Sequence, residues 1–233
     1  HIDPYHIDLE KEASWVKEFS AENNMYIELG ACGTSLEELK PSIDAAKLLG
    51  AKLLRTFVGG DCLDGRGATR KRAEKAKENL KKVLPYAKKQ GIMIAIENHG
   101  DIFIEDMLYI LELDSDFLGV CYDSGNFAFT GEDPLDGIKA FGNRILCTHL
   151  KDVCVEEAFP NAKPFETVNN PVHFCALGDG YLPMNEIISR LNEIGIENLT
   201  LEICSPCDKS LSEKDLLAFE ERNVKKSIFF IKG

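Results

Sequence analysis

The sequence predicts an α/β fold, a (β/α)8 TIM barrel of parallel strands, and three observations support this prediction. Short apolar segments alternate with amphipathic segments of helical periodicity along the chain. The apolar segments are almost continuously hydrophobic, which is typical of parallel strands covered by helices. Finally, 26 residues separate Glu97 from Asp123 and again Asp123 from His149, which is the length of one strand plus one helix.

The elements follow one another in strict alternation. Strands are predicted at 25–30, 52–58, 92–97, 117–123, 145–150 and 198–203. Helices are predicted at 10–23, 35–50, 69–90, 103–113, 183–195 and 213–229. Ser35 followed by Glu38 is a capping-box pattern that marks the start of the second helix, and Gly50 marks its end. The 69–90 segment carries Lys, Arg and Glu opposite an apolar stripe, which favours a solvated outer helix over a nucleic-acid-binding one.

Two features of the strand pattern need an explanation. A closed barrel has eight strands, and six are evident. The apolar stretch 172–178 is compatible with a seventh strand, but Pro171 and the Gly178–Asp179–Gly180 triplet suit a long rim loop equally well. Because the chain begins abruptly at His1, we expect one or two N-terminal βα units to be absent, so that 1–233 is a single, N-terminally incomplete barrel domain.

Composition indicates an ordinary enzyme domain. The chain has 233 residues with 44% hydrophobic content, enough for one sizeable core. A net charge of −12 and a pI of about 4.9 disfavour nucleic acid and anionic membrane surfaces as partners. No segment resembles a membrane span or a signal peptide. The eight cysteines are scattered through strand-like segments, so we expect reduced thiols and a cytoplasmic protein.

Ligand-type side chains end four of the predicted strands. They are Glu97, Asp123, His149 and Glu202. Because parallel strands of one barrel end on the same rim, the four side chains can converge on one point, and three carboxylates with one imidazole describe a divalent-metal site. Such donors favour Mn²⁺, Mg²⁺ or Co²⁺, and Zn²⁺ is also compatible. Taken singly, each acid is equally well a helix cap, and His149 a hydrogen-bonded core histidine.

Strand periodicity adds neighbours to this site. Residues two apart point the same way, so His99 is expected beside Glu97, and Lys151 beside His149, as substrate contacts. For Lys151 the alternative is a rim salt bridge with Asp152. Asp179 is either a substrate contact or simply part of a turn.

The same periodicity and the spacing of other reactive residues leave further interpretations open. Cys121, Cys147 and Cys204 are expected inside the barrel. Cys204 and Cys207 form a CxxC pair that we interpret as packed thiols rather than a redox or zinc motif. The glycine-rich segment 59–67 is expected to be a flexible rim loop, with phosphate binding as the weaker alternative.

Five motifs, in this order and spacing, resemble the xylose-isomerase-like TIM barrels, which include sugar phosphate isomerases and epimerases. They are IAIENHG (94–100), VCYDSGN (120–126), THLKD (148–152), LGDG (177–180) and LTLEIC (199–204). The resemblance implies that Glu97, Asp123, His149 and Glu202 hold a divalent metal on the fifth to eighth strands, and that 171–182 is the loop after the seventh. It also implies that Glu97 and Glu202 are the catalytic acid/base pair.

Two positions depart from the family pattern. Many members have His where this chain has Asn126, which we take as a substrate contact, and the ketose 3-epimerase branch usually has Arg where this chain has Val155. The resemblance implies a metal-dependent isomerase or epimerase, most simply with Mn²⁺, acting through an enediolate on a keto-sugar or cyclitol. A lyase of the same barrel family is the alternative. An abasic-site endonuclease and a non-enzymatic scaffold are the remaining hypotheses, and a homo-oligomer is common in the family.

Overall fold

The computed structural model describes residues 1–233 except 3–6, 114, 155–172 and 204–210. The chain divides into two compact units. The first comprises His1–Cys121 with Arg144–Leu146, and the second Tyr122–Asn143 with Cys147–Gly233.

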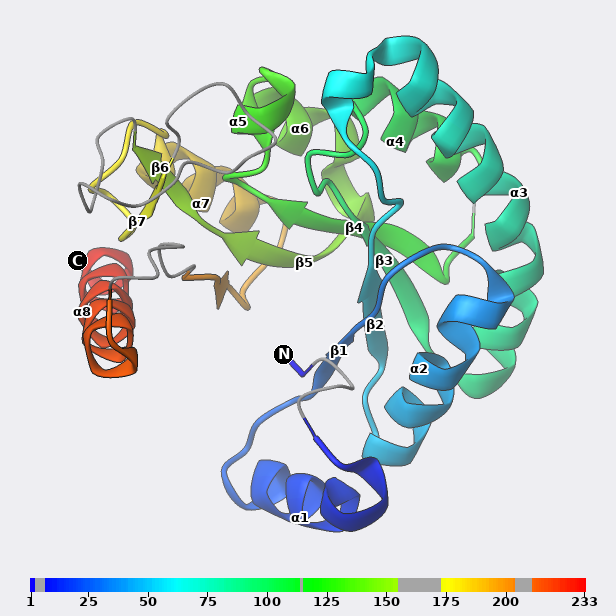
Figure 1. Ribbon diagram of the computed structural model, residues 1–233, viewed down its shortest axis with the longest axis horizontal. Helices are drawn as coiled ribbons and strands as arrows, with labels where there is room; N and C mark the ends of the chain where they lie inside the picture. Colours follow the sequence, from blue (N-terminus) through cyan, green and yellow to red (C-terminus); the bar gives the residue numbers. More distant parts are fainter. Residues whose placement is uncertain (3–6, 114, 155–172, 204–210) are drawn as a thin grey trace. The chain divides into compact units, whose positions relative to one another are not determined.

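Six strands form one sheet in the order β1-β2-β3-β4-β5-β8 (Figure 1). They are β1 (Glu28–Gly30), β2 (Leu53–Thr56), β3 (Met93–Glu97), β4 (Leu118–Asp123), β5 (Ile145–Leu150) and β8 (Thr200–Leu201). The pairs β1–β2, β2–β3, β3–β4 and β5–β8 are all parallel. Every strand predicted from the sequence is therefore present within its expected range, and the parallel sheet confirms a partial (β/α)8 barrel.

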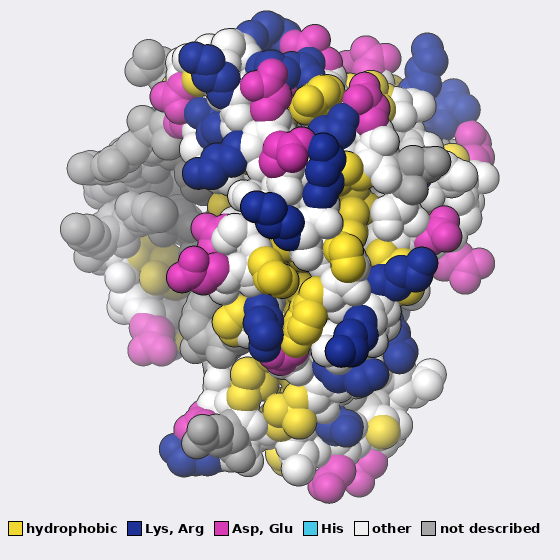
Figure 2. Space-filling model, turned by 90° about the vertical axis from the view of Figure 1, so that its right-hand side faces the viewer, with side chains coloured by type: hydrophobic (Ala, Val, Ile, Leu, Met, Phe, Trp, Pro, Cys, Tyr) yellow, Lys and Arg dark blue, Asp and Glu magenta, His cyan; other side chains and the backbone are white. Residues whose placement is uncertain are grey.

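Among its described residues, the first unit has four α-helices. They are α1 (Leu9–Glu22), α2 (Leu36–Leu49), α3 (Arg66–Gln90) and α4 (Ile104–Leu111), with a 3-10 turn η2 at Cys62–Asp64. Helix α3 buries its apolar stripe, as predicted: Ala73, Ala76, Leu80, Val83 and Ala87. Its opposite face is exposed, and Figure 2 shows Lys and Arg side chains interspersed with Asp and Glu there. No helix in the described part of the chain is long and apolar enough to span a membrane.

Helix α2 begins at the predicted capping box. The Glu38 backbone N–H donates to Ser35 Oγ at 3.3 Å, while the Ser35 N–H donates to Glu38 Oε2 at 2.8 Å. The helix ends at Gly50, whose φ of 80° is in the left-handed region that glycine adopts without strain.

Replacing Ser35 with Ala is expected to lower the free energy of unfolding by about 1 kcal/mol, because one helix-terminal N–H loses its acceptor. Urea denaturation followed by circular dichroism measures this change. The matched control is Ser42→Ala in the same helix, where no cap is lost. Equal effects of the two substitutions would show that Ser35 does not act as a cap.

The second unit contains helices α5 (Phe127–Thr130), α6 (Pro134–Phe141), α7 (Met184–Glu193) and α8 (Glu213–Lys232). The sequence analysis did not predict α5 or α6. Helix α6 has eight residues, too few for a clear periodicity, and Gly137 interrupts its apolar positions where the Phe127 ring packs closely on it. The signal that marks α6 is Asp133, which caps Leu135 N at 2.8 Å, followed by Pro134 in the first turn.

The apolar stretch 172–178, which the sequence left open, is neither a barrel strand nor a plain loop. Its residues His173–Cys175 form β7, which pairs antiparallel with β6 (Asp152–Cys154) in a separate two-stranded sheet. Val153 and Phe174 form a small core with Ala128, Phe129 and Leu182. The hairpin therefore begins one residue after Lys151.

Candidate metal centre

Three of the four expected metal ligands come together in the second unit. Asp123 ends β4, His149 lies near the end of β5, and Glu202 directly follows β8. The register His149↔Thr200 and the hydrogen bond from Glu202 N to Leu150 O bring the last two side by side. The ligand atoms of the three side chains lie within 4.8 Å of one another. Asp123 and His149 are buried, whereas the Glu202 side chain is 32% exposed.

The two oxygens of Asp123 have different partners. Oδ1 accepts the backbone N–H groups of Gly125 and Asn126, both at 2.9 Å, so the turn after β4 fixes this oxygen. Oδ2 lies 2.9 Å from Lys151 Nζ. Oδ2 is therefore the oxygen that contacts Lys151, while Oδ1 is engaged by the turn.

His149 and Glu202 contact each other directly. His149 Nδ1 lies 2.9 Å from Glu202 Oε2. The other Glu202 oxygen, Oε1, lies 3.0 Å from Lys151 Nζ. Both Glu202 oxygens therefore face the cluster.

The Lys151 side chain, only 4% exposed, lies among these ligands. Besides Asp123 Oδ2 and Glu202 Oε1, its ammonium donates to Asn126 Oδ1 at 3.4 Å and lies 5.0 Å from the centre of the Phe174 ring. Ser124 Oγ holds the Lys151 backbone, donating to its carbonyl at 2.7 Å and accepting its N–H at 3.0 Å. The expected neighbours Lys151 and Asn126 are thus both in the cluster.

The sequence left open a salt bridge between Lys151 and Asp152, and the structure gives Asp152 other partners. Its side chain is buried and accepts four backbone N–H groups, which belong to Val153, Gly178, Gly180 and Leu182 at 2.8 to 3.3 Å. Burial raises the pKa of Asp152, and the four N–H donors oppose that rise. Asp152 therefore anchors the 178–182 turn to the start of β6.

Asp179 lies in this turn, but its side chain is exposed and pairs with Lys226 of α8 at 2.5 Å. The structure thus gives Asp179 an ion pair with a helix and does not bring it into the cluster of Asp123, His149 and Glu202.

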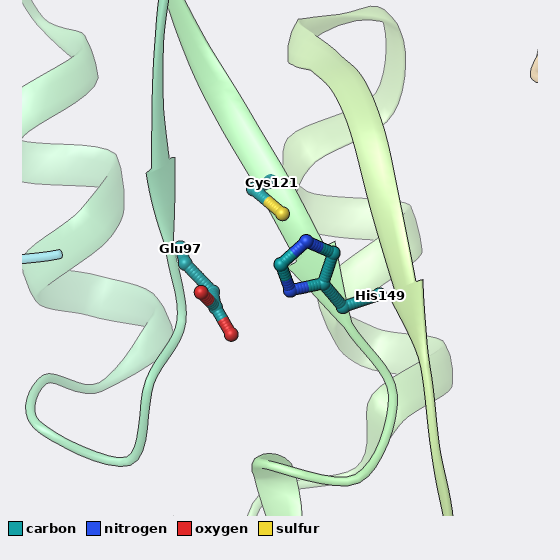
Figure 3. A group of neighbouring side chains, drawn as sticks. All are labelled: Glu97, Cys121 and His149. Atoms are coloured by element: carbon teal, nitrogen blue, oxygen red, sulfur yellow. The ribbon is translucent and has the colours of Figure 1, made fainter. Parts of the chain in front are cut away.

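Glu97, the fourth expected ligand, belongs to the first unit. It is the last residue of β3, is fully buried, and forms an ion pair with Arg55 of β2. In register it lies opposite Cys121 of β4, and its carboxylate and the Cys121 thiol lie within 4.8 Å of each other. Figure 3 shows these two side chains on their neighbouring strands, together with His149 on β5.

Other groups of the first unit surround the end of β3. His99 is exposed and stacks on Phe57, with ring centres 4.3 Å apart. Asp101 is buried and accepts the Gly59 N–H at 2.6 Å. Burial raises the pKa of Asp101, and this hydrogen bond opposes the rise.

Part of the glycine-rich segment 59–67 forms η2 and the start of α3. Its Arg66 pairs with Glu105 at 2.8 Å, and the following Arg70 with Asp106 at 3.1 Å, so both arginines contact carboxylates of α4. Cys121 and Cys147 are buried as predicted. Cys204, Cys207 and Val155 lie outside the described residues.

Sequence reasoning missed Arg55 and Asp152. Arg55 had a usable signal, since it is the one charged residue between Leu53 and Val58 in an otherwise apolar strand. Asp152 had none, because three of its four partners are backbone N–H groups of residues 26 to 30 positions further along the chain.

The donor set fits a divalent cation. Carboxylate oxygens suit Mg²⁺ and Mn²⁺, and an imidazole nitrogen with carboxylates also suits Zn²⁺ and Co²⁺. Asp123, His149 and Glu202 supply these donors from three neighbouring strand ends of a parallel sheet.

Comparison with known proteins identifies the family. The model of the xylose isomerase-like TIM barrel matches residues 29–232, and the chain belongs to this family. Curated relatives include the 3-oxo-isoapionate decarboxylase of Pectobacterium atrosepticum, which is 27% identical over 73% of this chain and 58% of its own length. The inosose dehydratase of Clostridium perfringens is 28% identical over 53% of this chain and 44% of its own. The chain thus spans about half the length of these relatives.

Solved structures share the fold at low identity. A xylose isomerase domain protein from Planctomyces limnophilus has a TM-score of 0.75 at 17% identity, covering 99% of this chain and 84% of its own. L-ribulose 3-epimerase has a TM-score of 0.70 at 16% identity, and the alignment covers 100% of this chain and 81% of the epimerase chain. The IolI protein with a bound zinc atom also has a TM-score of 0.70 at 16% identity, and the alignment covers 94% of this chain and 83% of the IolI chain. Enzymes similar to this chain therefore include both epimerases and lyases.

Proposed function

We propose that this chain belongs to a metal-dependent enzyme that removes a proton beside the carbonyl group of a small polyhydroxylated keto compound. The observation that carries the proposal is the cluster of Asp123, His149 and Glu202, the first two buried, at the carboxyl ends of parallel strands. Active sites of (β/α)8 barrels are found at this end of the strands. We propose Mn²⁺ as the cation, with the cluster residues as its ligands.

We assign Glu97 as the fourth ligand. Strand register supports this assignment, because Glu97 lies opposite Cys121, and Asp123 is two residues further along the same strand. Residues two apart in a strand point to the same face, so Asp123 shares the face of Cys121. The ion pair with Arg55 fixes the direction of the Glu97 carboxylate.

Asp123, His149, Glu202 and Glu97 would hold the cation, and a cation there would supply Lewis acidity that stabilises the negative charge developing on the substrate. Glu97 and Glu202 act as the acid/base pair, one on each side of the substrate carbon. Lys151 and Asn126 hold substrate oxygens, since both are buried beside the ligands. His99, exposed at the end of β3, and Asp179, in the turn held by Asp152, are proposed as further substrate contacts at the rim.

Return of the proton to the enediolate gives isomerisation or epimerisation, depending on the carbon and face that receive it. This is the outcome that we propose first, with a keto-sugar or a cyclitol as substrate. The second candidate is a lyase, in which the same enediolate expels a neighbouring group. The inosose dehydratase favours it, because loss of water is a reaction of this kind.

We further propose that residues 1–233 belong to one barrel domain and act in the cytoplasm. The cysteines support the location: the six that the structure describes are not in disulfides, and Cys62, Cys121 and Cys147 are buried.

Exchange of substrate hydrogen with solvent tests the proposal. The full-length protein, loaded with Mn²⁺, is incubated in D₂O with a panel of keto-sugars and inososes, and the products are analysed by mass spectrometry and NMR. Deuterium beside the carbonyl is expected for at least one compound. A product of unchanged composition identifies an isomerase or epimerase, and a product that has lost water or CO₂ identifies a lyase. Absence of exchange in the whole panel would refute the proton-abstraction chemistry.

A further inference from the structure

The Lys151 ammonium occupies the middle of the ligand cluster in the second unit. It lies 2.9 Å from Asp123 Oδ2 and 3.0 Å from Glu202 Oε1, and its side chain is almost fully buried. A buried lysine is stable only when its charge is compensated, and two carboxylates provide that compensation here. Lys151 is thus the counter-charge of Asp123 and Glu202 in the arrangement that the structure shows.

A metal ion and this ammonium need the same oxygens. Backbone N–H groups already hold Asp123 Oδ1, so Oδ2 is the oxygen more open to a cation, and it is the one that Lys151 contacts. Glu202 Oε1 likewise contacts Lys151, while Oε2 contacts His149. A cation bound at Asp123 Oδ2 would therefore compete with Lys151 for that oxygen.

Electrostatics gives the same result. A divalent ion held by Asp123 and Glu202 would lie within a few ångströms of the ammonium if Lys151 stayed in place. Like charges at such a distance repel strongly where water is scarce. Lysine has a flexible four-carbon stem, which lets the ammonium move without any backbone shift. Asn126 Oδ1 and the face of the Phe174 ring already lie near it and can hold it after release.

We propose that Lys151 is an internal cation that holds the metal-free site together and that the metal ion displaces. Displacement releases the ammonium from the carboxylates and makes it available to a substrate oxygen. Substrate binding through Lys151 then depends on prior binding of the metal. This inference rests on the proposed metal site, but it predicts a property of the protein that needs neither substrate nor turnover to observe.

The test compares cation affinity in full-length variants, after removal of metals with a chelator. Mn²⁺ binding is measured by isothermal titration calorimetry. Lys151→Met keeps the length of the side chain and removes the charge, so it is expected to bind Mn²⁺ about tenfold or more tightly than wild type. Its metal-free form is expected to melt at a lower temperature, because Asp123 and Glu202 then repel each other, and Mn²⁺ should raise that temperature more than in wild type.

Three further variants sharpen the comparison. Lys225→Met removes the same charge from an exposed position on α8, where Lys225 pairs with Glu221, and is expected to bind Mn²⁺ as wild type does. Lys151→Arg keeps the charge and is expected to keep the weaker affinity. Lys151→Gln removes the charge but can still donate hydrogen bonds, so it gives the affinity measurement if Lys151→Met does not fold.

The outcomes separate this inference from the proposed function. Equal Mn²⁺ affinity in wild type and in the uncharged Lys151 variants would overturn the internal-cation role while leaving the metal site intact. Binding only in the uncharged variants would show that Lys151 excludes the ion from the wild-type site, which would refute both the displacement and the proposed metal-dependent enzyme. Absence of binding in every variant would refute both the metal site and the displacement.

Discussion

Glu202→Gln is expected to slow hydrogen exchange between substrate and solvent by about a thousandfold or more, because an amide cannot accept the proton that a carboxylate accepts. The substitution keeps the shape of the side chain, which lies 3.0 Å from Lys151 Nζ and 2.9 Å from His149 Nδ1. It removes one of the three carboxylate charges of the proposed metal site, so Mn²⁺ affinity should fall as well. Both quantities are measured on the same protein, by NMR in D₂O and by calorimetry.

The matched control is Glu197→Gln, which makes the same chemical change at an exposed residue just before β8. This variant is expected to exchange substrate hydrogen at the wild-type rate. Circular dichroism of both variants checks that the fold is kept. Wild-type exchange in Glu202→Gln would show that Glu202 is neither the base nor a required ligand.

Asp152→Asn is expected to lower the free energy of unfolding by about 3 kcal/mol, because two of the four backbone N–H groups around this side chain would face an amide N–H₂ instead of an oxygen. Each carboxylate oxygen accepts two of the four N–H groups. Oδ1 accepts those of Val153 and Leu182, and Oδ2 accepts those of Gly178 and Gly180. Either orientation of the amide therefore leaves one pair without an acceptor. Urea denaturation measures the loss.

Asp136→Asn serves as the control for Asp152→Asn, since Asp136 is exposed in α6 of the same unit. Its effect should stay within about 0.5 kcal/mol. Hydrogen–deuterium exchange of the amides of Gly178, Gly180 and Leu182 gives a second readout, and faster exchange is expected in Asp152→Asn alone. Unchanged exchange at these amides would contradict the anchoring role of Asp152.

Much of the fold was predictable, because its signals are local. Alternating apolar strands and amphipathic helices fixed the parallel sheet, and Ser35 with Glu38 marked the start of α2. The ligand types at the strand ends were equally visible, and parallel strands bring such ends to one edge. On this basis Asp123, His149 and Glu202 were expected to lie close together, as they do, and their role as metal ligands stays a prediction.

The parts that the sequence did not reveal depend on partners far along the chain. Nothing near Lys151 says that its ammonium contacts Asp123 and Glu202, which are 28 and 51 residues away. The two-residue repeat of a strand predicted that Lys151 lies beside the candidate ligands, but it could not show that the ammonium contacts their carboxylates. The β6–β7 hairpin was missed for a similar reason, since antiparallel pairing of two three-residue segments leaves no periodic pattern.

The turn after β4 has a consequence for ion selectivity. Since Gly125 and Asn126 already donate to one oxygen of Asp123, a cation in the proposed site would be expected to use the other. Calcium usually needs six to eight oxygen ligands and gains them through two-oxygen carboxylates, whereas manganese and zinc are satisfied with fewer. Two backbone amides would thereby disfavour calcium in the proposed site by limiting its coordination number.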